Sequence, residues 1–320
     1  MATDPMAGLR KTQLMMSITE RAVRAWRLGE WALLHQVRPD GSSAPPDPRP
    51  FMPDRGSSLA FDDLDFTPDL GKNPVTSTAR YPVMTAAENL VGAAQAHSAP
   101  LQEGRTNIVS LGSLCRCAIE AAAKTVWLLA PTVRTERRAR CRGFIQSERQ
   151  PQQSFLRIEA RVLAKRQSDG LPADFQNFQR HRDEYDERQV LISALPKSER
   201  TRPPSNSSDI VSWSAKWIDA NPPAHAADEL PLGMELGADR FYSIGSSFVH
   251  GFKWMTDYIR DDEATLKVVA EGFAAAVVMT ECAVCLFESQ ATNAARAAVR
   301  RANYPDWLAP TVAAWLPRYQ

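Results

Sequence analysis

Apolar residues recur at steps of three and four positions along most of this chain, which is the spacing of one face of an α-helix. The clearest case is residues 105–129, which Pro131 follows as a stop. A face so continuous in apolar residues predicts a helix at the centre of the fold. Its apolar positions are Ile108, Leu111, Leu114, Cys115, Ala118, Ile119, Ala122, Val126 and Leu129.

A second buried helix is predicted at residues 262–300, where the apolar positions keep a seven-residue repeat. The sequence does not show the alternation of β-branched and polar residues that is typical of strands joined by hairpin turns. The sequence therefore predicts an all-α fold, a multi-helix bundle. The same periodicity predicts further helices at 8–37, 83–96, 134–166, 174–195 and 239–254, and a short helix that Ser208 or Asp209 caps and Asn221 ends.

The periodicity is lost between residues 38 and 82, where proline, glycine and serine are frequent. Such a composition cannot sustain a helix, so we expect a linker or a surface arm. Its acidic and aromatic stretch 61–66 either packs on the core or serves as a short partner-binding motif. The predicted organisation is an N-terminal helix (1–37), the arm (38–82), a helical bundle domain (83–303) and an apolar tail (304–320) that covers the bundle or a partner.

Charge is balanced over the 320 residues, with 38 Lys and Arg against 37 Asp and Glu. This balance gives no global electrostatic reason to expect nucleic acid, a membrane or an acidic partner. Arginine is nevertheless concentrated at 134–166. Because glutamates are interleaved there, we favour a solvated helix, and a phosphate contact such as RNA is the alternative.

The chain begins without a continuous apolar leader. Its longest apolar run, 272–287, contains Glu281 and is shorter than the roughly 20 residues that span a bilayer. The five cysteines are an odd number and unevenly placed, which does not suit a disulfide framework. We therefore expect a soluble, cytoplasmic protein without a membrane partner.

No cofactor or metal site is predicted. Cys282-x-x-Cys285 is a lone pair, and Cys115 and Cys117 point to opposite sides of a helix. Free cysteine in an alanine-rich helix is usually a small buried apolar residue. Glycine-rich phosphate loops and a Gly-x-Ser-x-Gly turn are absent from the sequence. The remaining histidines outside residues 239–254 have no ligand-spaced partner: His35, His97, His181 and His225.

The most suggestive chemistry is a polar row on the predicted helix at 239–254. Tyr242, Ser246 and His250 stand four residues apart, so they form a stripe that drifts by about 40° per step. Ser246 and His250 could act as nucleophile and base, but no oxyanion donor or orienting acid is apparent. We favour a buried polar network in which Tyr242 and His250 reach three residues elsewhere. These residues are Arg116 and Glu120, one turn apart and able to form a salt bridge, and Arg137.

Three motifs occur in a fixed order along the chain. They are Arg116-x-x-x-Glu120 in a helix ending Trp127-x-Leu-x-Pro131, the pair Glu136-Arg137, and Tyr242-x-x-x-Ser246-x-x-x-His250-Gly251. With these motifs the chain resembles a group of uncharacterised actinobacterial helical proteins. The resemblance implies an all-helical domain from about residue 83 to the last long helix and brings no activity with it. More distantly the pattern is similar to the HEPN-like superfamily, whose nucleases carry Arg-x(4–6)-His at a dimer interface; here Arg240 stands ten positions before His250.

Two hypotheses of function follow. The first is a non-enzymatic interaction or scaffold protein that binds protein partners or forms a homodimer through its tryptophan-rich tail or its N-terminal helix. The second is a HEPN-like RNA-processing or phage-defence ribonuclease that uses His250 with Arg116 or Arg137. A small-molecule pocket near Trp127 and Trp254 is a third possibility.

Overall fold

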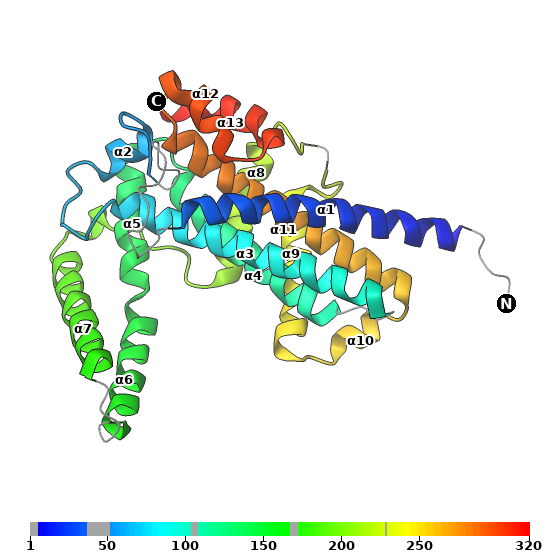
Figure 1. Ribbon diagram of the computed structural model, residues 1–320, viewed down its shortest axis with the longest axis horizontal. Coiled ribbons are helices and arrows are strands. Elements are labelled where there is room, and N and C mark those ends of the chain that lie inside the picture. Colours follow the sequence, from blue (N-terminus) through cyan, green and yellow to red (C-terminus); the bar gives the residue numbers. More distant parts are fainter. Residues whose placement is uncertain (1–5, 37–51, 104–107, 167–171, 228) are drawn as a thin grey trace.

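The computed structural model describes residues 6–36, 52–103, 108–166, 172–227 and 229–320. In these ranges every regular element is an α-helix or a 3₁₀-helix, and no strand occurs. The all-α prediction is therefore confirmed. Figure 1 shows a bundle of long helices from which one pair of helices projects to the side.

Helix α11 (Asp262–Ala291) is the axis of the bundle. Asp261 begins it, since its carboxylate accepts a hydrogen bond from the N–H of Ala264 at 2.8 Å. All residues from Gly272 to Ala291 are buried, as expected for a helix that is apolar on every side. The predicted continuation to residue 300 is wrong, because the backbone turns extended at Thr292 and a separate short helix, α12 (Ala297–Arg300), follows.

Within the described ranges, α11 is the one helix long and apolar enough to cross a membrane, but 94% of its most apolar window is buried inside the protein. A core helix of a soluble protein has this character. Three long helices contact α11 and contribute to this burial: α1 (Ala7–His35), α3 (Pro74–Glu103) and α4 (Ile108–Leu129). α1 also lies beside α3, and α3 beside α4 (Figure 1).

Helices α8 (Ser207–Ala220) and α9 (Gly233–His250) pack on each other and on α4. The cap of α8 is Asn206, whose side-chain oxygen accepts from the N–H of Asp209 at 2.7 Å, and not Ser208 or Asp209 as predicted. Gly251 ends α9 with a left-handed φ of 65°, which glycine adopts without strain. The predicted helix at 239–254 therefore stops at His250, and a short helix, α10 (Trp254–Tyr258), follows.

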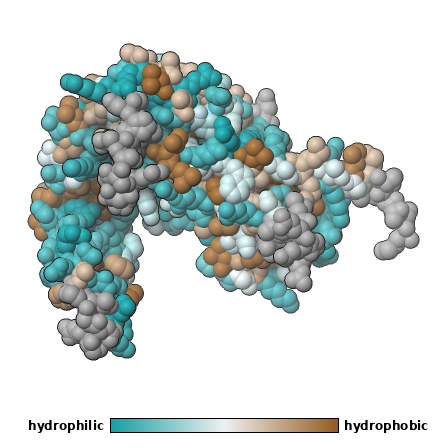
Figure 2. Space-filling model, viewed as in Figure 1, coloured by the Kyte–Doolittle hydropathy of each residue, from teal (hydrophilic) through white to brown (hydrophobic). Residues whose placement is uncertain are grey.

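The arginine-rich stretch is two helices, α5 (Arg134–Ser147) and α6 (Arg149–Lys165), that meet at Glu148. α6 pairs with α7 (Pro172–Ser193), and together they form the projecting arm of Figure 1. Figure 2 shows mainly hydrophilic residues on the visible face of this arm. The interpretation of 134–166 as a solvated segment holds for α6, whereas α5 buries Arg137 and Arg142.

The segment predicted to be a linker is helical in two places. α2 (Ser58–Asp63) has a capping residue, Ser57, and α3 starts at Pro74 and continues through Pro82. Proline is compatible with a helix start, because the first N–H groups of a helix have no partner within it. The expectation that 38–82 cannot sustain a helix is therefore wrong for these parts, and residues 37–51 lie outside the described residues. In the 61–66 stretch Asp62 is fully buried and Phe66 packs on the core, whereas Phe61 and Leu64 are exposed, so this piece packs on the core only in part.

The C-terminal tail packs on the bundle of its own chain. It consists of the short helices η5 (Asp306–Leu308), α13 (Ala309–Trp315) and η6 (Leu316–Tyr319). Leu308, Trp315 and Tyr319 are buried, and the Tyr319 hydroxyl donates to the carbonyl of Ala130 at 3.2 Å. The tail is thus occupied by intramolecular contacts.

Candidate functional site

The structure brings three of the six predicted site residues together between α4 and α9. The hydroxyl of Tyr242 donates to Oε2 of Glu120 at 3.1 Å, and the guanidinium of Arg116 lies 4.2 Å from the centre of the Tyr242 ring. Ser207 at the start of α8 donates to Oε1 of Glu120 at 2.7 Å. The predicted polar network is confirmed for these residues. The salt bridge of Glu120, however, is made with Lys124 at 3.3 Å, one turn along α4 in the other direction.

The contacts in this network move the pKa values of Glu120 and Tyr242 in opposite directions. Burial would raise the pKa of Glu120, but the hydrogen bond from Ser207, the charge of Lys124 and the hydrogen bond from Tyr242 together lower it below its ordinary value. Burial and the negative charge of Glu120 raise the pKa of Tyr242. Tyr242 is therefore a neutral donor and Glu120 an ionised acceptor near neutral pH.

Two predicted members of the network lie elsewhere. His250 is the exposed last residue of α9, and its ring lies 5.5 Å from that of Phe252. The reason is the drift of the row, because two steps of about 40° turn His250 away from the face that Tyr242 presents to α4. Arg137 is buried in α5, where its NH2 donates to Asp62 at 2.9 Å and its NH1 to the carbonyl of Pro131 at 2.9 Å.

A hollow of about 590 Å³ opens beside Arg116 and Tyr242, where α4, α8, α9 and the start of α10 meet. We call it the serine hollow. Ser246, the third member of the predicted row, is part of its wall. The hollow is lined by Arg116, Ser208, Asp209, Ser212, Asp239, Tyr242, Ser243, Ser246, Ser247, Phe252 and Trp254.

Gly245 lets Arg116 lie against α9. A Cβ at this position would stand 3.1 Å from both Cβ and Cδ of Arg116, closer than ordinary van der Waals contact. With glycine there, the guanidinium settles over the Tyr242 ring, an arrangement that stabilises a cation by roughly 0.5–2 kcal/mol. Arg116 therefore keeps a defined position at the wall of the hollow.

Arg116 is the cation on the wall of the hollow, and its side chain is half-buried. Among the described residues, no carboxylate lies within ion-pair distance of Arg116. Nε of Arg116 and Oγ of Ser247 make no hydrogen bond to the described residues, and both atoms are buried beneath the surface of the wall. Leaving a buried donor unpaired costs about 1–3 kcal/mol, so the exposed part of the Arg116 guanidinium is the group suited to a polar ligand.

Two acidic residues, Asp209 and Asp239, also line the hollow. Asp209 accepts from the side-chain amide of Asn206 at 2.8 Å. Burial, and after it the charge of Glu235, raises the pKa of Asp239. The wall of the hollow thus contains one arginine and two acidic residues.

No protein-family model, curated protein or solved structure matches the chain. The resemblance to the actinobacterial group and to HEPN-like domains therefore stays a prediction. Among the described residues, no group of three or more His, Cys, Asp or Glu side chains could hold a metal ion.

Sequence reasoning missed two buried carboxylates of α11. Glu281 accepts hydrogen bonds from Nε of Arg24 at 2.9 Å and from the indole of Trp307 at 2.8 Å, and Nε2 of His225 lies 3.0 Å away. Glu288 repeats this arrangement one heptad later. Its partners are Nε of Arg300 at 2.8 Å, the indole of Trp31 at 2.9 Å and Nε2 of His35 at 3.0 Å.

Each of these carboxylates is thus held by one arginine, one tryptophan and one histidine. Both are completely buried, and His225 and His35 are nearly so, which leaves no path for a substrate. We interpret the clusters as structural connections between α11, α1 and the C-terminal segment. A signal was present in the sequence, since a charged residue inside an otherwise apolar helix requires partners.

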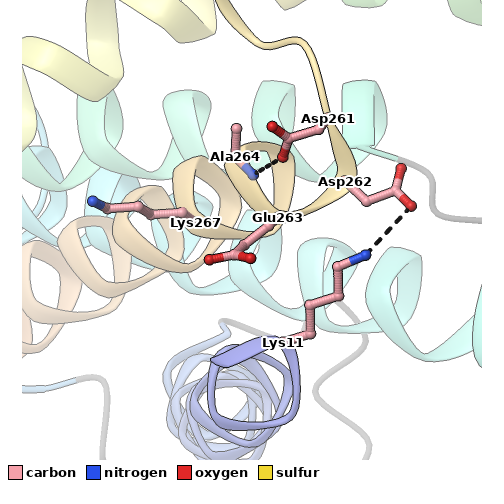
Figure 3. Close-up of a pocket in the computed structure, with 6 residues that line it drawn as sticks. All are labelled: Lys11, Asp261, Asp262, Glu263, Ala264 and Lys267. Atoms are coloured by element: carbon pink, nitrogen blue, oxygen red, sulfur yellow. Dashed lines mark hydrogen bonds and ion pairs between the residues drawn. The ribbon is translucent and has the colours of Figure 1, made fainter. Parts of the chain in front are cut away.

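A larger hollow, of about 720 Å³, lies where the first turns of α1 and α11 approach (Figure 3). The acidic side chains that line it already have partners within the protein. Asp261 caps α11, Asp262 pairs with Lys11 at 3.7 Å, and Glu263 pairs with Arg10 at 2.6 Å. These are helix-capping and surface interactions, so the serine hollow is the better candidate for a binding site.

Proposed function

We propose that this chain is a non-enzymatic binding protein whose serine hollow takes a small molecule with one anionic group and one flat apolar group. The observation that carries the proposal is Arg116, a half-buried cation on the wall of the hollow that has no carboxylate partner among the described residues. A planar guanidinium binds carboxylate and phosphate oxygens through paired hydrogen bonds. The anionic group would therefore lie against the guanidinium of Arg116.

The remaining wall of the hollow suits the flat apolar group of the proposed ligand. Phe252 and Trp254 are exposed aromatic residues on its wall, and an aromatic ring offers a flat apolar surface for stacking. Asp209 and Asp239 would repel a second negative group, so a ligand with a single anionic end is favoured.

A binding role is favoured over catalysis because the groups of the hollow lack an activated pair. Among the described residues, no hydrogen bond joins Ser246 to His250, which is the exposed last residue of α9 and has its ring against Phe252. The raised pKa of Tyr242 keeps its hydroxyl protonated near neutral pH, so Tyr242 does not act as a base there. The ribonuclease alternative needs His250 beside Arg116 or Arg137, and Arg137 is engaged with Asp62.

Calorimetric titration tests the proposal with benzoate and phenyl phosphate as probes, and with benzamidine as a cationic probe of similar shape. We expect binding of one or both anionic probes and none of benzamidine. Arg116→Gln should weaken binding by roughly tenfold or more, because a hydrogen bond to a charged group contributes about 1.5–3 kcal/mol.

The matched control is Arg260→Gln, which removes an exposed arginine outside the hollow. It should bind the probes as the wild type does. The proposal fails if neither anionic probe binds, or if both variants bind equally. Degradation of total RNA by the purified protein, lost in His250→Ala, would instead support the ribonuclease.

A further inference from the structure

Helix α1 has apolar residues on two faces. Its inner face, which includes Ile18, Ala25 and Leu28, is buried against the bundle. A second set faces outward and is between 43% and 68% exposed. We call this set the outer seam, and it consists of Leu9, Met16, Val23, Trp26 and Leu33.

The outer seam follows the spacing of a coiled coil. Leu9, Met16 and Val23 are seven residues apart, Trp26 comes three later, and Leu33 is seven beyond Trp26. These are the a and d positions of a heptad, which form a continuous stripe toward a partner helix. Figure 1 shows α1 along the outside of the bundle, with its first turns reaching beyond it. Figure 2 shows residues of intermediate and hydrophobic character at that end.

Charges beside the outer seam point to the identity of the partner. Glu20 and Arg27 are exposed, stand seven residues apart and border the same side of the seam. Arg27 also pairs with the exposed Glu30 of its own helix at 2.6 Å, so a second glutamate would share its guanidinium. When two such helices run antiparallel about a two-fold axis near residue 24, Glu20 of each comes opposite Arg27 of the other. A surface that is complementary to itself under a two-fold axis is an isologous interface.

We propose that two copies of this chain associate through the outer seams of their α1 helices, which run antiparallel. This inference is independent of the ligand proposed for the serine hollow. In this register Val23 packs on Trp26 of the partner subunit, and Met16 packs on Leu33 of the partner subunit. Thr19 faces Glu30 of the partner subunit, a polar layer that helps to fix the register.

In this register a groove beside Leu33 can accept the side chain of Met16 of the partner subunit. Leu33 lines an apolar groove of about 240 Å³ between α1 and α3, together with Trp26, Gly29 and Val91. Methionine fills irregular apolar spaces with little strain, because its side chain is flexible and unbranched. One helix per copy makes a small interface, so we expect a dissociation constant on the order of micromolar.

Sedimentation velocity over a range of concentrations tests for the dimer. Wild-type protein should shift from monomer to dimer as its concentration rises through the micromolar range. Val23→Glu places a charge in the centre of the seam and should raise the dissociation constant more than tenfold. Val299→Glu, which changes an equally exposed valine on α12, is the matched control and should dimerise normally.

A charge exchange tests the antiparallel register. Glu20→Arg brings Arg27 of the partner subunit opposite an arginine, and Arg27→Glu brings two glutamates together. Each change should weaken the homodimer by about tenfold, since two repulsive pairs arise by symmetry. The double variant E20R/R27E should recover wild-type affinity, and the two single variants mixed together should form a heterodimer.

Three results would overturn the proposal. They are a wild-type chain that stays monomeric at all concentrations, a Val23→Glu variant that dimerises like the Val299→Glu control, and a double variant that is no better than the single ones. The last outcome would specifically exclude the antiparallel register.

Discussion

At the scale of single residues, Glu288 shows how an internal charge is stabilised. Burial would raise its pKa, but the charge of Arg300, the His35 ring 3.0 Å away and the hydrogen bond from Trp31 outweigh burial and hold the pKa at about 2. Asp54, 3.8 Å from Arg300, adds a further charge to this cluster. The ionised form of Glu288 is thus built into the folded state.

This depressed pKa predicts a pH dependence of stability. The folded-state pKa of Glu288 lies below its ordinary value of 4.5. The stabilisation of the fold by ionised Glu288 is therefore complete above pH 4.5 and is lost as the pH falls toward 2. The free energy of unfolding should decrease by about 3 kcal/mol across this window from Glu288 alone. Glu288→Gln should remove this part of the decrease and destabilise the protein at pH 7 by roughly 3–5 kcal/mol.

Urea unfolding at pH 7, 5 and 3 measures both effects. Glu271→Gln serves as the control, because Glu271 is a partly exposed glutamate of the same helix. It should keep the pH dependence of the wild type. A Glu288→Gln variant with an unchanged pH profile would contradict the role assigned to this cluster.

At the scale of elements, glycine decides how closely two helices approach. Gly272 of α11 faces Phe241 of α9, and a Cβ at Gly272 would lie 1.9 Å from Cε2 of the phenyl ring. The ring is itself fully buried, so it has little room to move. The contact between α9 and α11 therefore depends on a residue without a side chain.

Gly272→Ala should lower the free energy of unfolding by about 1–3 kcal/mol, because the core must shift to accept the methyl group. Gly237→Ala in α9 is the matched control, since no heavy atom lies within 4 Å of the added Cβ. Alanine favours the helix there by roughly 0.5–1 kcal/mol, so this variant should be stabilised. Thermal unfolding of the two variants distinguishes them, and equal effects would contradict the packing of α9 on α11.

At the scale of the whole molecule, burial divides the cysteines. All five are free thiols, and Cys117 is the exposed one. Burial and the charge of Asp63 raise the pKa of Cys141 to about 12, against the smaller lowering by Thr78 and Arg142. The closed interior therefore protects thiols that an unfolded chain would present.

Ellman's reagent should modify one thiol of the folded protein and five in denaturant. The reaction of Cys117 should be slow at neutral pH and accelerate in alkali, because burial and the charge of Glu120 raise the pKa of this thiol. Cys117→Ser should abolish the reaction of the folded state. Rapid modification of a second thiol would show that the bundle opens.

Part of the candidate site could be predicted from the sequence, and part could not. Tyr242, Glu120 and Arg116 were predicted to meet because each stands on a strongly periodic helix with an apolar face. His250 could not be placed, since its direction depends on where α9 ends and on which face α4 covers. Arg137 was misplaced because its partner, Asp62, belongs to a segment without a helical pattern.

The helical class, the central place of α4 and α11 and most helix positions could be predicted from local pattern, because periodicity and capping act between residues close along the chain. The partners of Glu288 could not, since Trp31 stands 257 positions away from it. The packing of helices also buries the tail against the bundle and leaves the outer seam of α1 exposed. Such pairings depend on how whole helices pack, and no local pattern records which faces will meet.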